Sequence, residues 1–239
     1  MRARRSTLTL AATLSFVFLF HATAPAQETV DIKGVKAALL KPKREPVGSL
    51  VLLAGGDGEI GVGAKGKIER EGNQLVRTRQ AYVAKGFAVL VPDADVDVVA
   101  AVDYMANIRK PVTLVGTSRG TQRAAVGLAA GANPDALVVT SGFLSPQSGE
   151  RVNRHVIRIV GSPARLPRTL VIHHRRDACQ YTLPAGVQPF LDWSQGRARV
   201  IWLDGGRSEG DPCRARAYHG FNGIDAKVVD AVTAFANEK

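Results

Sequence analysis

Ser118 is the residue of this sequence that is best placed to do chemistry. It is the central letter of GTSRG at 116–120, which follows an apolar run at 112–115 and precedes an Ala-rich segment at 121–130. In the G-x-S-x-G pattern, a sharp turn between a strand and a helix lifts a serine hydroxyl off the end of the strand. Gly116 and Gly120 suit such a turn, because side chains there would collide with the neighbouring strand and helix. The pattern predicts a nucleophilic serine; the alternative is an ordinary turn with a solvent-facing serine.

A serine hydroxyl is a poor nucleophile unless a base takes its proton and a third group orients that base. The chain offers Asp177 and His219 after Ser118. We favour His219 as the base, because it falls between the last predicted strand and the last predicted helix. The other four histidines lie in the N-terminal leader, in an irregular stretch or at a strand end: His21, His155, His173 and His174. For the acid, Asp204 and Asp211 remain alternatives to Asp177.

The segments around these residues alternate between strands and helices. Near-continuous apolar runs predict strands at 49–54, 87–91, 112–117, 135–142, 169–174 and 198–203. Helical spacing and end signals predict helices at 73–85, 95–108, 121–130, 186–193 and 224–237. This alternation predicts an α/β fold, a doubly wound and mostly parallel sheet with helices on both faces. Such sheets bind ligands at the carboxyl ends of their strands, where Ser118 and Asp177 fall.

Three further segments have less regular patterns. Residues 29–41 predict an edge hairpin that turns near Gly34. Residues 59–72 are rich in glycine and charge, and they predict a long surface loop near the site. Residues 143–168 predict a modest excursion over the site, too short to form a full cap domain.

The order Ser118, Asp177, His219, with YHGF at 218–221 before the final helix, resembles the α/β-hydrolase family. The resemblance runs from about Ser49 to the end. It implies that Ser118 accepts the acyl group, that His219 is the general base and acid, and that Asp177 orients it, since the family places the acid on the earlier of the candidate loops. It also implies an oxyanion hole made by the N–H of Arg119 and one from the turn at Gly55, Gly56 and Asp57.

The implied activity is the cleavage of a carboxylic ester through an acyl-enzyme, with no cofactor and no metal. The sequence departs from many lipases at Arg119, a cation that could attract an anionic substrate or pair with an acid. The HGGG-type oxyanion motif of some esterases is missing, and no large cap is expected, which favours small, polar or polymer-bound esters. A peptidase or amide hydrolase would use the same triad, and a non-catalytic binding protein could share the scaffold.

The N-terminus predicts export. A basic start at 1–5, an apolar stretch at 8–20 and small residues at 22–26 are typical of a signal peptide over 1–26. An uncleaved membrane anchor is the alternative. Residues 27–239 would then form a single periplasmic or secreted domain with no membrane span. In such a compartment the two cysteines, Cys179 and Cys213, predict one disulfide, which would tie the loop of Asp177 to the loop of His219 and hold them in register.

Charge and motifs argue against two other classes of function. The net charge is +11, and loss of residues 1–26 removes three arginines and no acid, which lowers it to +8. These basic residues are scattered and form no recognition helix, so nucleic acid is not the favoured partner. The letters GVGAKG at 61–66 fit G-x-G-x-x-G, but no strand precedes them at the right distance, and no P-loop pattern occurs. Two cysteines without histidines at suitable spacing make a poor zinc site.

Overall fold

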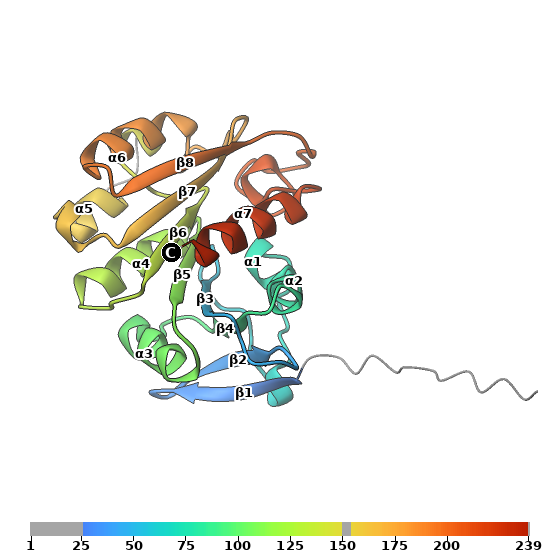
Figure 1. Ribbon diagram of the computed structural model, residues 1–239. Helices are drawn as coiled ribbons and strands as arrows, with labels where there is room; N and C mark the ends of the chain where they lie inside the picture. Colours follow the sequence, from blue (N-terminus) through green and yellow to red (C-terminus); the bar gives the residue numbers. More distant parts are fainter. Residues whose placement is uncertain (1–25, 150–153, 239) are drawn as a thin grey trace, which may run out of the picture.

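A computed structural model of the chain describes residues 26–149 and 154–238. Its centre is one eight-stranded sheet in the order β1-β2-β4-β3-β5-β6-β7-β8 (Figure 1). The strands are β1 (Ala26–Ile32), β2 (Val35–Lys41), β3 (Ser49–Leu53), β4 (Ala88–Pro92), β5 (Val112–Thr117), β6 (Ala136–Thr140), β7 (Arg168–His174) and β8 (Ala198–Leu203). The six strands β3 to β8 run parallel to one another, and β1 and β2 form an antiparallel pair at one edge. The prediction of a mostly parallel sheet is confirmed.

Helices cover both faces of this sheet. The helices α1 (Gln74–Arg77), α2 (Arg79–Ala84) and α7 (Asp225–Asn237) lie on one face, and α3 (Val98–Ile108), α4 (Arg119–Ala129), α5 (Val156–Val160) and α6 (Val187–Trp193) lie on the other (Figure 1). Successive strand residues point to opposite faces, so Leu50 and Leu52 join one core while Val51 and Leu53 join the second. This double burial is the reason that the central strands read as continuous apolar runs.

The edge hairpin is also confirmed. β1 and β2 pair up to Ile32 and Val35, and the two turn residues, Lys33 and Gly34, both have positive φ, at 52° and 88°. That combination belongs to the tight turn that best matches the twist of a two-stranded ribbon.

The predicted helix at 73–85 is divided into α1 and α2 at Thr78, which has φ −97° and ψ 1°. The Thr78 hydroxyl donates a hydrogen bond of 2.7 Å to the carbonyl of Gln74. Serine and threonine side chains compete in this way for helix carbonyls and bend the helix. The end signals that predict one helix at 73–85 do not reveal this local competition.

Residues 59–72 lie near the predicted site, but the expectation of a surface loop is wrong for part of them. Ile60, Val62 and Ile68 are buried, and the segment contains the short helix η1 (Ala64–Gly66). The carboxylate of Asp93 accepts hydrogen bonds from the N–H groups of Ile60, at 2.8 Å, and Val62, at 3.1 Å. Three apolar side chains and one carboxylate therefore hold a segment whose overall composition is polar.

The excursion at 143–168 also differs from its prediction. Its described part contains η2 (Pro146–Ser148), α5 and η3 (Pro163–Arg165), and α5 packs beside α4. Val156, Val160 and Leu166 are buried in the core on that face of the sheet. These apolar side chains draw α5 onto the sheet layer rather than over the site.

The predicted signal peptide lies outside the described residues apart from Ala26, which begins β1. Within the described ranges, no helix is both long enough and apolar enough to cross a membrane.

Candidate active site

Ser118 occupies a sharp turn between β5 and α4, with φ 52° and ψ −125°. A residue other than glycine in such a backbone conformation costs about 1–3 kcal/mol and persists only where its surroundings enforce it. Here the Ser118 N–H donates to the carbonyl of Thr140 at 3.0 Å, at the end of β6, and its carbonyl accepts from the N–H of Thr121 at 3.0 Å. The turn is thus fixed to the neighbouring strand on one side and to its own helix on the other.

Two glycines make this turn possible by close approach. A Cβ added at Gly116 would lie 2.6 Å from the carbonyl oxygen of Gly120, and one added at Gly120 would lie 2.1 Å from the carbonyl oxygen of Leu53. Both distances are far below van der Waals contact. The spacing of glycines around Ser118 therefore reflects the packing of α4 against β3 and β5.

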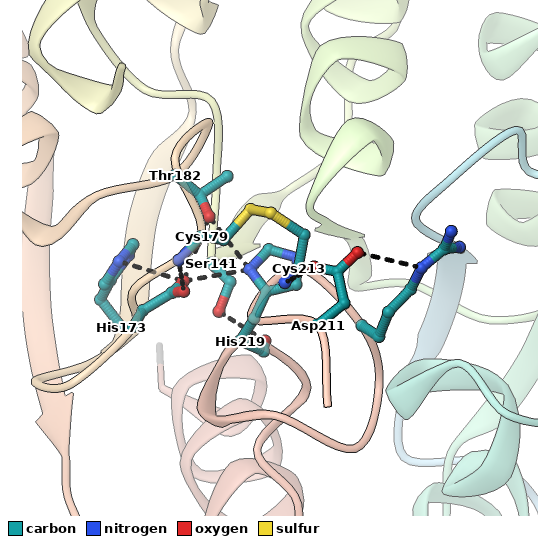
Figure 2. The surroundings of a disulfide bond; sticks show 9 residues. Ser141, His173, Cys179, Thr182, Asp211, Cys213 and His219 are labelled. Atoms are coloured by element: carbon teal, nitrogen blue, oxygen red, sulfur yellow. Dashed lines mark hydrogen bonds and ion pairs between the residues drawn. A yellow bond between two sulfur atoms is a disulfide. The ribbon is translucent and has the colours of Figure 1, made fainter. Parts of the chain in front are cut away.

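Asp177 follows β7 and is buried, with 3% of its surface exposed. Its Oδ1 accepts a hydrogen bond of 2.9 Å from the N–H of Cys179. Its Oδ2 lies 3.0 Å from His219 Nδ1 and accepts a hydrogen bond of 3.1 Å from the hydroxyl of Thr182. Figure 2 labels Cys179, Thr182 and His219, three residues that contact this carboxylate. Two donors besides the imidazole therefore hold the carboxylate in place.

His219 lies in η5 (Tyr218–Gly220) and is also buried, at 5% exposure. The hydroxyl of Ser141 donates to its backbone carbonyl at 2.8 Å (Figure 2). With Nδ1 engaged by Asp177, the ring presents Nε2 as its proton-accepting atom. The imidazole is thus held by its backbone and by its acid partner.

A disulfide joins the two loops that carry these residues, as the sequence predicted. Cys179 and Cys213 are 34 residues apart in the sequence and their Cα atoms are 4.6 Å apart (Figure 2). Cys179 is two residues beyond Asp177 and also donates its N–H to that carboxylate. The bridge therefore fixes the acid loop against the chain that leads into η5.

Ser118 and His219 line the same cleft, which has a volume of about 300 Å³. Its wall also includes Gly55, Gly56 and Asn73. No hydrogen bond joins the Ser118 hydroxyl to His219 in the described part of the chain. Such bonds are commonly long in ligand-free sites and tighten when substrate binds.

The turn after β3 presents backbone N–H groups beside Ser118. The Arg123 guanidinium donates to the carbonyls of Ala54, Gly56 and Asp57, the last two at 3.4 Å. In a trans peptide the N–H points opposite to the carbonyl, so the N–H groups of Gly55 and Asp57 face away from Arg123. A Cβ added at Gly55 would lie 3.0 Å from Ser118 Cβ.

These turn N–H groups and that of Arg119 are available to a ligand. Within residues 26–149 and 154–238, the N–H groups of Gly55, Gly56, Asp57 and Arg119 have no hydrogen-bond acceptor. Four unengaged donors around one serine can stabilise a negative charge on a bound oxygen atom.

Solved structures of similar shape identify this architecture. A dienelactone hydrolase from Anabaena variabilis matches with a TM-score of 0.60 at 15% identity, over 89% of this chain and 97% of that one. A serine hydrolase without a lid from Xanthomonas campestris matches with a TM-score of 0.58 at 14% identity, over 91% of this chain and 97% of that one. An esterase from Pyrococcus furiosus matches with a TM-score of 0.61 at 13% identity, over 87% of this chain and 88% of that one. The chain has the α/β-hydrolase fold. No protein-family model and no curated protein matches the sequence.

Within this α/β-hydrolase fold, the rival acids lie elsewhere. The exposed Asp204 carboxylate pairs with Arg176 at 3.0 Å, and its pKa is lowered by a hydrogen bond from the Gly205 N–H and by that arginine. Asp211 accepts from the N–H of Cys213 at 2.8 Å. Of the three candidate acids, Asp177 is the one that contacts His219 in the described structure.

The rival histidines have structural partners. His155 Nδ1 accepts the N–H of Arg158 at the start of α5. His174 Nδ1 accepts the N–H of Arg176, which leaves its Nε2–H to donate to the carbonyl of Gly205 at 3.0 Å, and its ring stacks on Tyr218. In the described ranges, neither histidine lines the Ser118 cleft of this α/β-hydrolase fold, and no group of metal-ligating side chains could hold an ion.

Thr182 was not found from the sequence, whereas His173, which the sequence analysis places at a strand end, lies beside the acid as a packed residue. The Thr182 hydroxyl lies 3.1 Å from Asp177 Oδ2 and 3.0 Å from His219 Nδ1, so it touches both groups (Figure 2). His173 is buried with its Nε2 3.6 Å from Asp177 Oδ2, and burial lowers its pKa to about 4, so its ring is neutral above that pH. Thr182 lies in an irregular loop, where no periodicity marks it.

Proposed function

We propose that this protein is a serine hydrolase that cleaves a carboxylic ester through an acyl-enzyme. One observation carries the proposal: a serine on a strained turn shares a cleft with a buried histidine whose Nδ1 is held by a buried carboxylate. This arrangement provides a nucleophile, a base and a group that orients the base. The esterases and hydrolases among the structures of similar fold support the same reaction class.

In the proposed mechanism, the Ser118 oxygen attacks the ester carbonyl while His219 Nε2 takes the hydroxyl proton. Asp177 accepts the Nδ1–H bond, keeps the ring in the tautomer with a free Nε2, and stabilises the imidazolium that forms. The tetrahedral intermediate collapses, His219 returns the proton to the departing alcohol, and the acyl group stays on Ser118. Water then attacks this acyl-enzyme with His219 as base, which releases the acid and restores Ser118.

The oxyanion of each tetrahedral intermediate would be bound by backbone donors. We assign this role to the N–H of Arg119, at the start of α4, together with one from Gly55, Gly56 or Asp57. These N–H groups have no other acceptor in the described ranges. Arg123 binds carbonyl oxygens of the turn after β3, and the N–H groups of Gly55 and Asp57 face away from Arg123. Each donor of this kind contributes about 3 kcal/mol to the stability of a transition state.

The substrate class follows from what surrounds the cleft. The described part of the excursion at 143–168 supplies no residue to the wall of the Ser118 cleft, so that part forms no cap over the cleft itself. We therefore propose a small or polymer-bound ester, with an anionic group that Arg119 would attract. The signal-peptide pattern at 1–26 and the disulfide support a periplasmic or secreted enzyme with a single domain at 27–239.

Labelling with a fluorophosphonate tests the nucleophile directly. The wild type should be labelled at Ser118, while Ser118→Ala and His219→Ala should not. The acid is tested by a matched pair in which each variant loses one carboxylate charge: Asp177→Asn should lose most of its labelling rate, and Asp204→Asn, altered at an exposed ion pair, should keep it. An unlabelled wild type that is folded and disulfide-bonded would refute the proposal and favour a binding protein on this scaffold.

A substrate panel separates ester from amide chemistry. Short-chain 4-nitrophenyl esters should be hydrolysed, and the matching 4-nitroanilides should be hydrolysed far more slowly. Comparable turnover of the anilides would assign the protein to the amide hydrolases, which use the same three residues.

A further inference from the structure

A second and larger cleft, of about 580 Å³, begins at the nucleophile turn and follows α4. Arg119, Arg123 and Val126 line it on the α4 side, and the segment 95–99 lines it opposite. It shares Gly56 and Asp57 with the cleft of Ser118. A molecule whose carbonyl lies at Ser118 can therefore extend past the 56–57 turn into this second cleft.

The arginines of this cleft outnumber its available acids. Arg119, Arg123 and Arg154 line it together with Asp57, Asp95 and Asp97. Two of these acids already have a cation, since Asp97 pairs with Lys33 at 2.6 Å and Asp57 pairs with Arg70 at 3.1 Å. Asp95 is the one acid of the three without an ion pair in the described ranges. The cleft therefore carries an excess of positive charge.

Arg119, which directly follows Ser118, is a cation of this cleft that a ligand can reach. Its side chain is exposed, and it has neither a carboxylate partner nor a hydrogen-bond acceptor within the described ranges. Arg123, one helical turn further on, donates its hydrogen bonds to backbone carbonyls rather than to a carboxylate. The pKa of Arg123 is lowered by burial and then by the charge of Arg119, so the two like charges oppose each other. An anion beside them would relieve that repulsion.

We infer that this cleft is a subsite for an anionic group of the substrate, and that the Arg119 guanidinium binds that group. The inference rests on the proposed function and narrows its substrate class to esters that carry a carboxylate a few bonds from the scissile carbonyl. A guanidinium binds a carboxylate through two parallel N–H bonds, which fixes orientation as well as charge. The anion can belong to the acyl part or to the alcohol part, and the experiment separates the two.

The experiment compares length-matched pairs of esters. For the acyl part, the pair is the 4-nitrophenyl monoester of adipic acid and 4-nitrophenyl hexanoate. For the alcohol part, it is 3-carboxyphenyl acetate and phenyl acetate. The measured quantity is the ratio of kcat/KM for the anionic ester to that for the neutral one, so a general change in activity cancels.

In at least one pair, Arg119→Gln should lower this ratio by about 10- to 150-fold, the loss expected when a charged hydrogen-bond partner is removed. Arg119→Lys should recover part of it, because charge returns without the paired donors. Val126→Glu, which places an acid at an exposed position of the same cleft, should lower the ratio independently. Arg109→Gln removes the same charge from a distant ion pair with Glu45 and should leave the ratio unchanged.

The two ways of failing can be told apart. A wild type that hydrolyses both members of each pair, with ratios that Arg119→Gln and Val126→Glu change by less than twofold, overturns the anionic subsite and leaves the hydrolase intact. A wild type that hydrolyses none of the esters and resists fluorophosphonate overturns the proposed function itself, and the subsite with it.

Discussion

Replacing Thr182 by valine tests whether its hydroxyl positions the acid and the base. The substitution keeps the shape of a fully buried side chain but removes the oxygen that lies 3.1 Å from Asp177 Oδ2 and 3.0 Å from His219 Nδ1. A hydrogen bond to a charged group is worth about 1.5–3 kcal/mol. If that energy is felt in the transition state, where His219 is charged, kcat should fall by about 10- to 150-fold.

The assay is steady-state hydrolysis of a neutral ester, with kcat and KM determined separately. We expect the loss to fall on kcat while KM changes little, because Thr182 touches the acid and base and not the substrate. Thr182→Ser retains the hydroxyl and should recover most of the rate. The matched control is Thr233→Val, which removes another buried threonine hydroxyl, bonded to the carbonyl of Val229 in α7. A folded Thr182→Val with kcat within twofold of the wild type would refute this reasoning.

Two further predictions concern stability. Replacing both Cys179 and Cys213 by alanine should lower the free energy of unfolding by about 4 kcal/mol for a loop of this length. Urea titration of the wild type and the variant would measure this difference. A variant as stable as the wild type would show that the disulfide does not stabilise the fold. Because His173 has a pKa of about 4 when folded and near 6.5 when unfolded, the unfolded chain binds its proton first as pH falls. Stability should drop by about 3 kcal/mol from pH 6.5 to pH 4, and His173→Gln should remove that part of the dependence; an unchanged slope would count against a buried neutral ring.

The layers of the fold were predictable because they follow from burial on both faces. Each central strand is apolar throughout, and glycines stand where α4 touches β3 and β5, so Gly116 and Gly120 mark the turn in the sequence itself. The disulfide followed from an even cysteine count and an export pattern. These features depend on neighbours in sequence or on composition.

What the sequence did not predict depends on hydrogen bonds between distant segments. Thr78 divides a helix because its hydroxyl competes for a carbonyl, and Thr182 contacts His219 across 37 residues. Arg123 likewise reaches a turn more than sixty residues earlier in the chain. A threonine or arginine in such a place looks like any other until the loops are folded, so no pattern of spacing identifies it.

The end of β6 connects the two halves of the proposed site. The carbonyl of Thr140 accepts the N–H of Ser118, and the hydroxyl of the next residue, Ser141, donates to the carbonyl of His219. Ser141 is itself tied to β7 through its N–H and the carbonyl of Ile172. Adjacent residues of one strand end therefore fix the backbone of the nucleophile and the backbone of the base. The separation of Ser118 and His219 is thus set by the sheet, while the disulfide and Thr182 set the orientation of the acid toward the base.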